Sequence, residues 1–336
     1  FAHTASYDAM ISETLNPQLP LGDMGLGGEL VHTLRYGENP QQSANWYRKK
    51  GSSDGLHNAE ILQGKPLSYN NLLDLDAAVE TLQEFSDKPT CVAVKHLNPC
   101  GVAAAENTAA AVEQALKADP VSVFGGIVAV NRDVDAASAE KLTSLFLECI
   151  VAPSFSSEAR SVLAKKKNLR LLQWSDVANK GKGEVKVRSV AGGFLLQTED
   201  QVKGWQDSWK VIGDEPSPAE KASLTLAWKV CAHLKSNAIA IISGEQSVGL
   251  GMGQVNRVDA VEQAIIRMKK HHWGCENPVL ASDAFFPFAD SIERISQAGI
   301  KWVIQPGGSM RDEEVIEMAK QKGVHLVLTG ERHFQH

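Results

Sequence analysis

The sequence has few cysteines and no long apolar run. Its five cysteines are odd in number and scattered, and neither a Cys-x-x-Cys pair nor a Cys/His cluster with zinc spacing occurs. A disulfide framework and a structural metal site are therefore not expected. No apolar run approaches the roughly 18 residues that a membrane-spanning helix needs. These absences indicate a reduced, cytoplasmic protein without a membrane partner.

The sequence also lacks an excess of positive charge. It holds 34 Lys and Arg against 40 Asp and Glu, a formal net charge of -6 at pH 7. We therefore expect no nucleic-acid partner, although this balance leaves room for a local basic pocket that holds one small anion. The first residues have no starting Met, basic stretch or apolar stretch, which we interpret as a fragment of a longer protein.

Apolar runs of strand length alternate with amphipathic segments along most of the chain. Together with 336 residues, 43% hydrophobic and 22% charged, this alternation predicts a globular α/β protein of about two domains. We expect residues 1–30 to end one module and form a linker, residues 31–200 to form a first α/β subdomain, and residues 201–336 to form a second. The linker includes the Pro- and Gly-rich run from Pro17 to Gly28.

Several helix ends and one domain junction can be predicted from local signals. Ser217-Pro218-Ala219-Glu220 is a capping box with proline in the first turn, which predicts a helix from Pro218 to about Leu234. Asn70 or Asn71 is expected to cap a helix that runs through Phe85. A third helix is expected from Arg257 to His271. The pattern loosens over residues 173–215, including the Gly-rich segment 180–184, and we expect the junction there.

The stretch from Cys91 to Gly101 carries titratable groups to the end of an apolar run. It predicts a central strand that Pro99 and Gly101 would stop, with Lys95 and His96 at its tip. Ligands in open α/β sheets bind beyond the carboxyl ends of strands, which favours a site there. Both side chains can reach one ligand only if the backbone leaves β geometry or the ligand lies across the end of the strand. The alternative is a solvated lysine beside a hydrogen-bonded histidine.

Three further motifs have more than one interpretation. The glycines at 249, 251 and 253 do not have dinucleotide-binding spacing, and a Gly-rich strand open to a ligand competes with purely structural glycines. The phenylalanines of residues 285–288 either fill the core or form the wall of a site for a flat ligand. Residues 332–336 end the sequence, where segments are usually poorly ordered.

Together these segments resemble a known family. The chain resembles the transformylase half of the bifunctional purine-biosynthesis protein, which joins AICAR (5-aminoimidazole-4-carboxamide ribonucleotide) transformylase to IMP cyclohydrolase. The most specific segment is Lys95-His96-Leu97-Asn98-Pro99-Cys100-Gly101, supported by residues 34–42, 119–130, 235–237, 282–288, 305–309 and 332–334. The resemblance implies two tandem cytidine-deaminase-like three-layer subdomains without zinc, and a homodimer with active sites at or near the interface. It also implies formyl transfer from 10-formyl-tetrahydrofolate to AICAR, and identifies residues 1–15 as the tail of the cyclohydrolase module.

The resemblance also implies the roles of individual residues. The catalytic residues are Lys95, His96 and Asn237, with His96 as the base, Lys95 as oxyanion stabiliser or acid, and Asn237 orienting the reacting groups. The residues that hold the nucleotide are Arg35, Tyr36 and Arg332. The residues that line the folate and nucleotide pocket are Phe124, Gly125, Glu148, Arg257, Phe285, Pro287 and Asp290. Residues 231–235 help to bind potassium in some relatives, so this ion is a further expectation.

Two other functions compete with formyl transfer. One is a nucleotide deaminase of the same fold, which the absence of zinc ligands disfavours. The other is a catalytically silent subunit that only binds a nucleotide or folate. The presence of Lys95, His96 and Asn237 together favours the transformylase over both.

Overall fold

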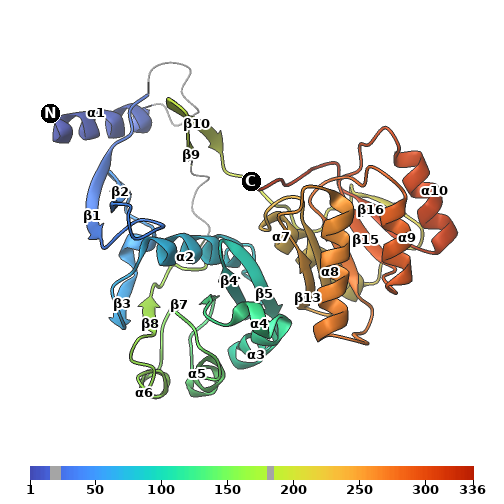
Figure 1. Cartoon of the computed structure of the whole chain (residues 1–336), viewed down its shortest axis with the longest axis horizontal. Coiled ribbons are helices and arrows are strands. Elements are labelled where there is room, and N and C mark those ends of the chain that lie inside the picture. The colour runs from blue at the N-terminus through green and yellow to red at the C-terminus, as the bar shows by residue number, and fades with distance from the viewer. Residues whose placement is uncertain (16–23, 180–184) are drawn as a thin grey trace.

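The structure is a computed structural model that describes residues 1–15, 24–179 and 185–336. Among these residues, twelve strands join in one mixed sheet, in the order β11-β16-β15-β14-β12-β13-β5-β4-β6-β7-β8-β3. Helices lie on both faces of this sheet (Figure 1). The protein is therefore an α/β protein, as the alternation in the sequence predicts.

The sheet consists of two halves with the same arrangement of strands. The first half contains β3 (Glu60–Gln63), β4 (Thr90–Lys95), β5 (Asn98–Ala104), β6 (Ile127–Val130), β7 (Cys149–Ala152) and β8 (Arg170–Gln173). The second half contains β11 (Lys210–Ile212), β12 (Ile239–Ser243), β13 (Gln246–Gly251), β14 (Val279–Ser282), β15 (Trp302–Gln305) and β16 (His325–Leu328).

Each half begins at the centre with an antiparallel hairpin, β4–β5 or β12–β13. An antiparallel neighbour, two parallel strands and an antiparallel edge strand follow outward in both halves. The halves meet where Gln246 of β13 pairs with Ala103 of β5, so these two central strands run antiparallel.

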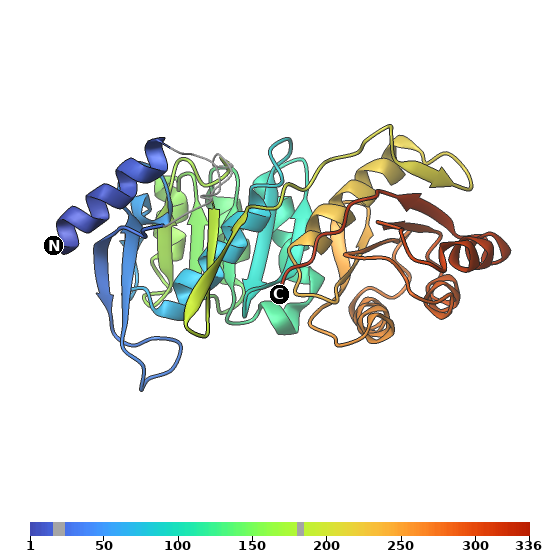
Figure 2. The same ribbon diagram turned by 90° about the horizontal axis from the view of Figure 1, so that it is seen from above.

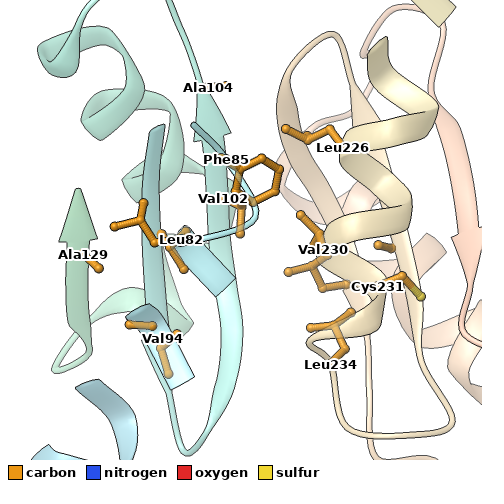
Figure 3. Close-up of a cluster of buried hydrophobic side chains, with 14 of the residues drawn as sticks. Leu82, Phe85, Val94, Val102, Ala104, Ala129, Leu226, Val230, Cys231 and Leu234 are labelled. Carbon is orange, nitrogen blue, oxygen red and sulfur yellow. The ribbon is translucent and has the colours of Figure 1, made fainter. Parts of the chain in front are cut away.

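Two helices share one face of the sheet, and their core continues across both halves. These are α2 (Tyr69–Leu82) and α7 (Pro218–Ala232). Figure 3 shows Phe85, three residues after the end of α2, facing Leu226 and Val230 of α7. Burial of this apolar surface stabilises the contact between the two halves in addition to the short β5–β13 pairing.

The opposite face carries two separate cores. The first half has α3 (Thr108–Ala118), α4 (Pro120–Val123), α5 (Ala136–Thr143) and α6 (Ser157–Leu163), and the second has α8 (Arg257–His271), α9 (Asp290–Gln297) and α10 (Asp312–Lys322). The described chain is thus a three-layer α/β/α structure.

Several elements lie outside the main sheet (Figures 1 and 2). They are α1 (Ala2–Leu15), the hairpin of β1 (Gly28–Leu34) and β2 (Ala44–Lys49), a short 3-10 helix (Leu56–Asn58), and the hairpin of β9 (Val185–Val190) and β10 (Gly193–Thr198). No residue of α1 is buried. In β10, Phe194 and Leu195 are 44% and 59% exposed, which is unusual for adjacent large apolar side chains.

Most predicted elements are confirmed to within a few residues. The capping box of Ser217 and Glu220 forms at the start of α7, and α8 has the predicted ends. The predicted cap of α2 is wrong: Ser68 is the N-cap, and Asn71 completes a capping box from the third helical position. Residues 16–23 of the predicted linker and residues 180–184 lie outside the part of the chain that the structure describes.

The predicted end of the central strand at Lys95 is confirmed, but the predicted reason for it is wrong. β4 does end at Lys95, but Pro99 and Gly101 lie inside β5 and do not stop a strand. A β-carbon on Gly101 would lie 2.1 Å from the carbonyl oxygen of Ala115 in α3. Glycine is therefore needed here because the backbone of a helix lies directly against the strand.

The glycines of β13 have the same role. A β-carbon on Gly249 would lie 2.3 Å from the carbonyl oxygen of Ala264, and one on Gly251 would lie 2.1 Å from that of Ala260. Both acceptor residues belong to α8. Of the two interpretations left open by the sequence, the structural one holds for these two glycines, because they admit a helix and not a ligand.

Candidate active site

Lys95 and His96 lie at a tight turn between β4 and β5. The strands pair in register up to Lys95 and Asn98. His96 and Leu97 form the turn with φ of 53° and 63°, a left-handed conformation that is uncommon for residues other than glycine. The backbone therefore leaves β geometry directly after Lys95, which meets the condition for both side chains to serve one ligand.

Asp74 of α2 stabilises this turn. Its Oδ1 accepts a hydrogen bond from the N–H of Leu97 at 2.7 Å, and its Oδ2 accepts one from the N–H of His96 at 3.4 Å. One carboxylate thus satisfies two backbone donors in an otherwise unfavourable conformation. His96 is exposed, just beyond the end of the central strand β4.

The ammonium of Lys95 lies beside an aromatic pair. Its Nζ donates to the carbonyl oxygen of Phe124 at 2.6 Å. The next residue, Gly125, has φ of 75°, so the loop takes a conformation that glycine adopts without strain. The ring of Phe124 is 54% exposed and packs at a tilt against Phe146, with 5.5 Å between ring centroids. A polar and an apolar contact surface therefore adjoin here.

Glu148 precedes β7 in the same region. Its N–H donates to the carbonyl of Gly126, and its Oε2 accepts from Nδ2 of Asn71 at 2.8 Å and lies 3.8 Å from Nη1 of Arg170. This position is at the amino ends of the parallel strands β6 to β8, because β4 runs antiparallel to β6. The rule about carboxyl ends therefore does not explain this part of the site.

Asn237 lies just before β12, and both ends of its side chain are fixed. Its Oδ1 accepts from Nη2 of Arg257 at 2.6 Å, and its Nδ2 donates to the carbonyl oxygen of Gln254 at 2.8 Å. These two hydrogen bonds give the amide of Asn237 one orientation in this structure. The peptide bond between Ser236 and Asn237 is cis.

A buried ion pair supports Asn237 from behind. Arg257 is 6% exposed and Asp283 is fully buried, and Nη1 of Arg257 donates to Oδ1 of Asp283. The same nitrogen lies 3.0 Å from Oγ of Ser282, and Ser236 donates to Oδ2 of Asp283 at 2.6 Å. Buried charges are costly unless such partners surround them, so these groups act as one unit.

Asn98 connects this unit to the turn of the first half. Its Nδ2 donates to the carbonyl of His96 at 3.0 Å, and its Oδ1 accepts from the N–H of Lys235 at 3.0 Å. Because β5 and β13 run antiparallel, the start of β5 and the end of β13 lie on the same side of the sheet, where the strands end. Lys95, His96 and Asn237 therefore lie at this same end of the central strands.

The predicted nucleotide-binding residues belong to exposed segments. Arg35 is exposed, with its guanidinium 5.6 Å from the ring centroid of Tyr36, and its loop is joined to α2 by a hydrogen bond from Asn70 to the carbonyl of Glu38. Arg332 is exposed and lies 4.8 Å from the ring centroid of Phe334. Within the described residues, no hydrogen bond or ion pair joins either arginine to Lys95, His96 or Asn237.

The aromatic loop after β14 divides between core and surface. Phe286 is fully buried, and its N–H donates to Oε1 of Gln305 at 2.9 Å, whereas Phe285 and Phe288 are 37% and 50% exposed. Pro287 is half-buried, and Asp290 begins α9 as an exposed residue. One ring thus fills the core, and two remain available to a ligand.

Sequence reasoning missed the residues that hold the site together. It did not select Asp74, Ser236 or Asp283 for a role. A carboxylate directly before the buried Leu75 of an amphipathic helix is a weak signal for Asp74. For Asp283 the only signal was its position directly after the buried strand β14.

A surface groove lies elsewhere. It has a volume of about 460 Å³ and is lined by Asp119, Val121, Ser122, Asp259, Glu262, Gln263, Ile266, Arg267, Lys270 and His271, from α4, α8 and adjoining residues. None of the predicted site residues lines it. Over residues 1–15, 24–179 and 185–336, no three His, Cys, Asp or Glu side chains are placed to hold a metal ion, and no helix combines the length and apolarity needed to cross a membrane.

Comparison with known proteins supports the resemblance. Residues 1–267 match the family described as AICARFT/IMPCHase bienzyme, a span that contains Lys95, His96 and Asn237. The chain belongs to this family. The AICARFT/IMPCHase match ends before Phe285 and Arg332, which lie instead within the alignments to curated relatives.

Curated relatives cover the whole chain. It is 47% identical over 343 residues to the bifunctional purine biosynthesis protein PurH of Streptococcus agalactiae serotype III (strain NEM316), and 46% identical over 342 residues to that of Nostoc punctiforme. All of this chain is aligned in both cases, and it spans 66% of each relative's length. A solved structure titled "Structural genomics, protein ybgI, unknown function" covers 60% of this chain and 70% of its own at 12% identity and a TM-score of 0.13.

Proposed function

We propose that this chain catalyses formyl transfer from 10-formyl-tetrahydrofolate to the 5-amino group of AICAR, giving formyl-AICAR and tetrahydrofolate in purine (IMP) biosynthesis. The observation that carries the proposal is the hydrogen-bonded connection through Asn98. It links the turn that carries the exposed His96, next to Lys95, to the segment that carries Asn237, at one end of the central strands. Membership of the AICARFT/IMPCHase family supports the choice of reaction.

Formyl transfer needs three catalytic functions at this end of the central strands. The acceptor amine must lose a proton as it attacks the formyl carbon, the oxygen of the tetrahedral intermediate must be stabilised, and the folate nitrogen must gain a proton as its bond to carbon breaks. His96 is the base, and Lys95 is the oxyanion stabiliser or acid. Asn237 orients the reacting groups, because Arg257 and Gln254 fix both ends of its amide.

The substrates find suitable surfaces beside these groups. The exposed rings of Phe124 and Phe285 offer flat apolar contacts for a reduced folate. Arg35, Tyr36 and Arg332 hold the nucleotide, with the arginines suited to its phosphate. Gly125, Glu148, Pro287 and Asp290 complete the pocket, and a potassium ion near residues 231–235 belongs to the same proposal.

The remaining parts of the proposal concern assembly. The two halves of the sheet correspond to tandem cytidine-deaminase-like subdomains without zinc, over residues 31–200 and 201–336, and residues 1–30 are the tail of a cyclohydrolase module and a linker. The protein works in the cytoplasm as a homodimer with its active sites near the interface. Support comes from the exposed positions of Arg35 and Arg332 and from the apolar surface of β10, since such surfaces often mark contacts between proteins.

An assay of tetrahydrofolate formation tests the proposal. We expect tetrahydrofolate to appear from 10-formyl-tetrahydrofolate only when AICAR is present, with formyl-AICAR formed in equal amount. Release of ammonia from a nucleotide would identify the deaminase instead. Binding of both substrates without turnover would identify a silent subunit, and simple hydrolysis of the formyl donor would appear equally without AICAR.

A further inference from the structure

Residues 332–336 lie against the body of the protein in an extended conformation. The N–H of His333 donates to the carbonyl of Asp283 at 3.1 Å. The N–H of Ser236 donates to the carbonyl of Gln335 at 2.9 Å, and the N–H of Gln335 donates to Oγ of Ser236 at 3.1 Å. Arg332 and Phe334 are exposed and His333 is buried, the alternation of an extended strand.

His333 is the side chain that this segment buries. It is 3% exposed, and its ring lies edge-on to that of the buried Trp228, with centroids 5.0 Å apart. Its Nδ1 lies 2.6 Å from Oδ2 of Asp200, in the segment after β10. Its Nε2 is buried without a hydrogen-bond partner. Ring packing and a single polar contact therefore hold His333 in place.

The position of His333 fixes the residues around it. Alternation along an extended backbone makes Arg332 point away from the face that receives His333, so a shift of one residue would reverse the exposure of Arg332. Ser236 receives Gln335 and at the same time donates to Asp283, the partner of Arg257. Arg257 in turn donates to Asn237. The docked segment thus sets the exposure of its own Arg332 and is linked by hydrogen bonds to Asn237.

We infer that His333 is a positioning residue, which fixes residues 332–336 in register so that Arg332 presents its guanidinium to the nucleotide and Ser236 keeps the Asp283–Arg257–Asn237 unit in place. The inference rests on the proposed function for the roles of Arg332 and Asn237. The docking of the segment by His333 does not depend on that function and can be measured separately.

Two variants separate the contributions of the ring. His333→Ala removes both the packing on Trp228 and the contact with Asp200. His333→Phe keeps an aromatic ring in the pocket, where the unpartnered Nε2 shows that no second polar contact is lost. His325→Ala is the matched control. His325 also packs on a tryptophan, Trp302, and contacts an aspartate, Asp214. It lies at the start of β16, on the side of the sheet away from the strand ends that carry Lys95 and Asn237.

Hydrogen exchange of the intact protein measures docking without reference to activity. We expect the hydrogen-bonded amides of Ser236, His333 and Gln335 to exchange at least about tenfold faster in His333→Ala than in the parent and the His325→Ala control, because these amides lose their partners when the segment detaches. His333→Phe should lie between the parent and His333→Ala. Unchanged exchange in His333→Ala would overturn the inference even in a protein without transformylase activity.

Kinetics measure the consequence for the nucleotide. We expect His333→Ala to raise the KM for AICAR roughly tenfold, with a smaller change in the KM for the folate, because misplacement of a binding group weakens the contact that it makes. Combined with Arg332→Ala, it should add little further change in the KM for AICAR, since both act through one contact. Fully additive effects would show that His333 does not act through Arg332 and would contradict the inference, whereas absence of turnover in the parent protein would contradict the proposed function alone.

Discussion

The side-chain oxygen of Asn98 accepts a hydrogen bond from the backbone N–H of Lys235 at 3.0 Å, across 137 positions of the sequence. The nitrogen of the same side chain donates to the carbonyl of His96. One amide thus connects the turn that follows Lys95 to the segment that carries Asn237. The relative position of the proposed catalytic groups depends on this contact as well as on the pairing of β5 with β13.

Replacing Asn98 should therefore damage activity and stability together. In Asn98→Ala the N–H of Lys235 loses its partner in a partly buried place, a loss that typically costs 1–3 kcal/mol of stability. We expect kcat/KM to fall at least roughly tenfold, because the catalytic groups lose a common anchor. Urea unfolding and steady-state kinetics measure the two effects. The exposed Asn45→Ala is the control, and an Asn98→Ala protein with unchanged kcat/KM would show that the anchor is dispensable.

His96→Ala should lower kcat roughly 10²-fold or more and leave the affinity for AICAR within a few-fold, since general bases typically contribute factors of 10² to 10⁴. Stopped-assay turnover and calorimetric titration with AICAR separate these quantities. His325→Ala serves as the control for loss of a histidine far from the proposed site. Near-normal turnover in His96→Ala would remove the assignment of His96 as the base.

Lys95→Arg should not restore the function of Lys95. The compact ammonium donates to the carbonyl of Phe124 at 2.6 Å, and a broad planar guanidinium cannot occupy the same position. We expect kcat to fall by roughly 10²-fold in this variant, as for loss of one oxyanion-stabilising donor. An active Lys95→Arg protein would show that only the charge is required.

Local signals explain why much of the fold can be predicted from the sequence. The capping box of Ser217 and Glu220 and the apolar run of β7 each depend on neighbours within a few positions, and both give the predicted element. The cap of α2 was misassigned because Ser68 and Asn71 satisfy each other reciprocally, so either residue alone fits the pattern. The continuation through Pro99 and Gly101 was missed because a hairpin partner and a helix backbone, not local preference, make β5 a strand.

The residues of the candidate site also differ in how well the sequence alone predicts them. Lys95 and His96 can be proposed from their position at the end of an apolar run, and Asn237 from the resemblance of its segment to the family. Asp74 and Asp283 cannot, because each acts through a hydrogen bond to a residue far along the sequence, 23 and 47 positions away, and these bonds exist only once the chain is folded. Side chains proposed for the chemistry are therefore easier to select from a sequence than the residues that hold them in place.

Gly251→Ala should destabilise the protein because α8 lies directly on β13. The added methyl group would lie 2.1 Å from the carbonyl oxygen of Ala260, so helix and strand must move apart. Overpacking of this kind typically costs 1–3 kcal/mol, and backbone on both sides allows little relaxation. Gly193→Ala in β10 is the matched control, because nothing lies within 4 Å of its added carbon. Equal unfolding midpoints in urea for the two variants would contradict this account.

Asp200 should give the protein a small stabilisation that acid removes. Burial raises the pKa of Asp200, but the hydrogen bond and the charge of His333 lower it more, and the pKa lies below the usual value of 3.8. A carboxyl whose pKa is depressed in the folded state stabilises the fold above its unfolded pKa, and this contribution is lost as the pH falls through the folded value. The side chain of Asp200 is 56% exposed, so we expect a contribution of under about 1 kcal/mol.

Urea unfolding of the parent protein and of Asp200→Asn at a series of pH values tests this expectation. The difference in unfolding free energy should be present near pH 6 and should shrink as the pH falls below about 4, because the carboxylate of the parent then takes up a proton and resembles the amide. Asp207→Asn, an exposed residue of the same segment, controls for the general effect of removing a negative charge. A difference that grows toward acid, or that Asp207→Asn reproduces, would show that the contact with His333 is not its source.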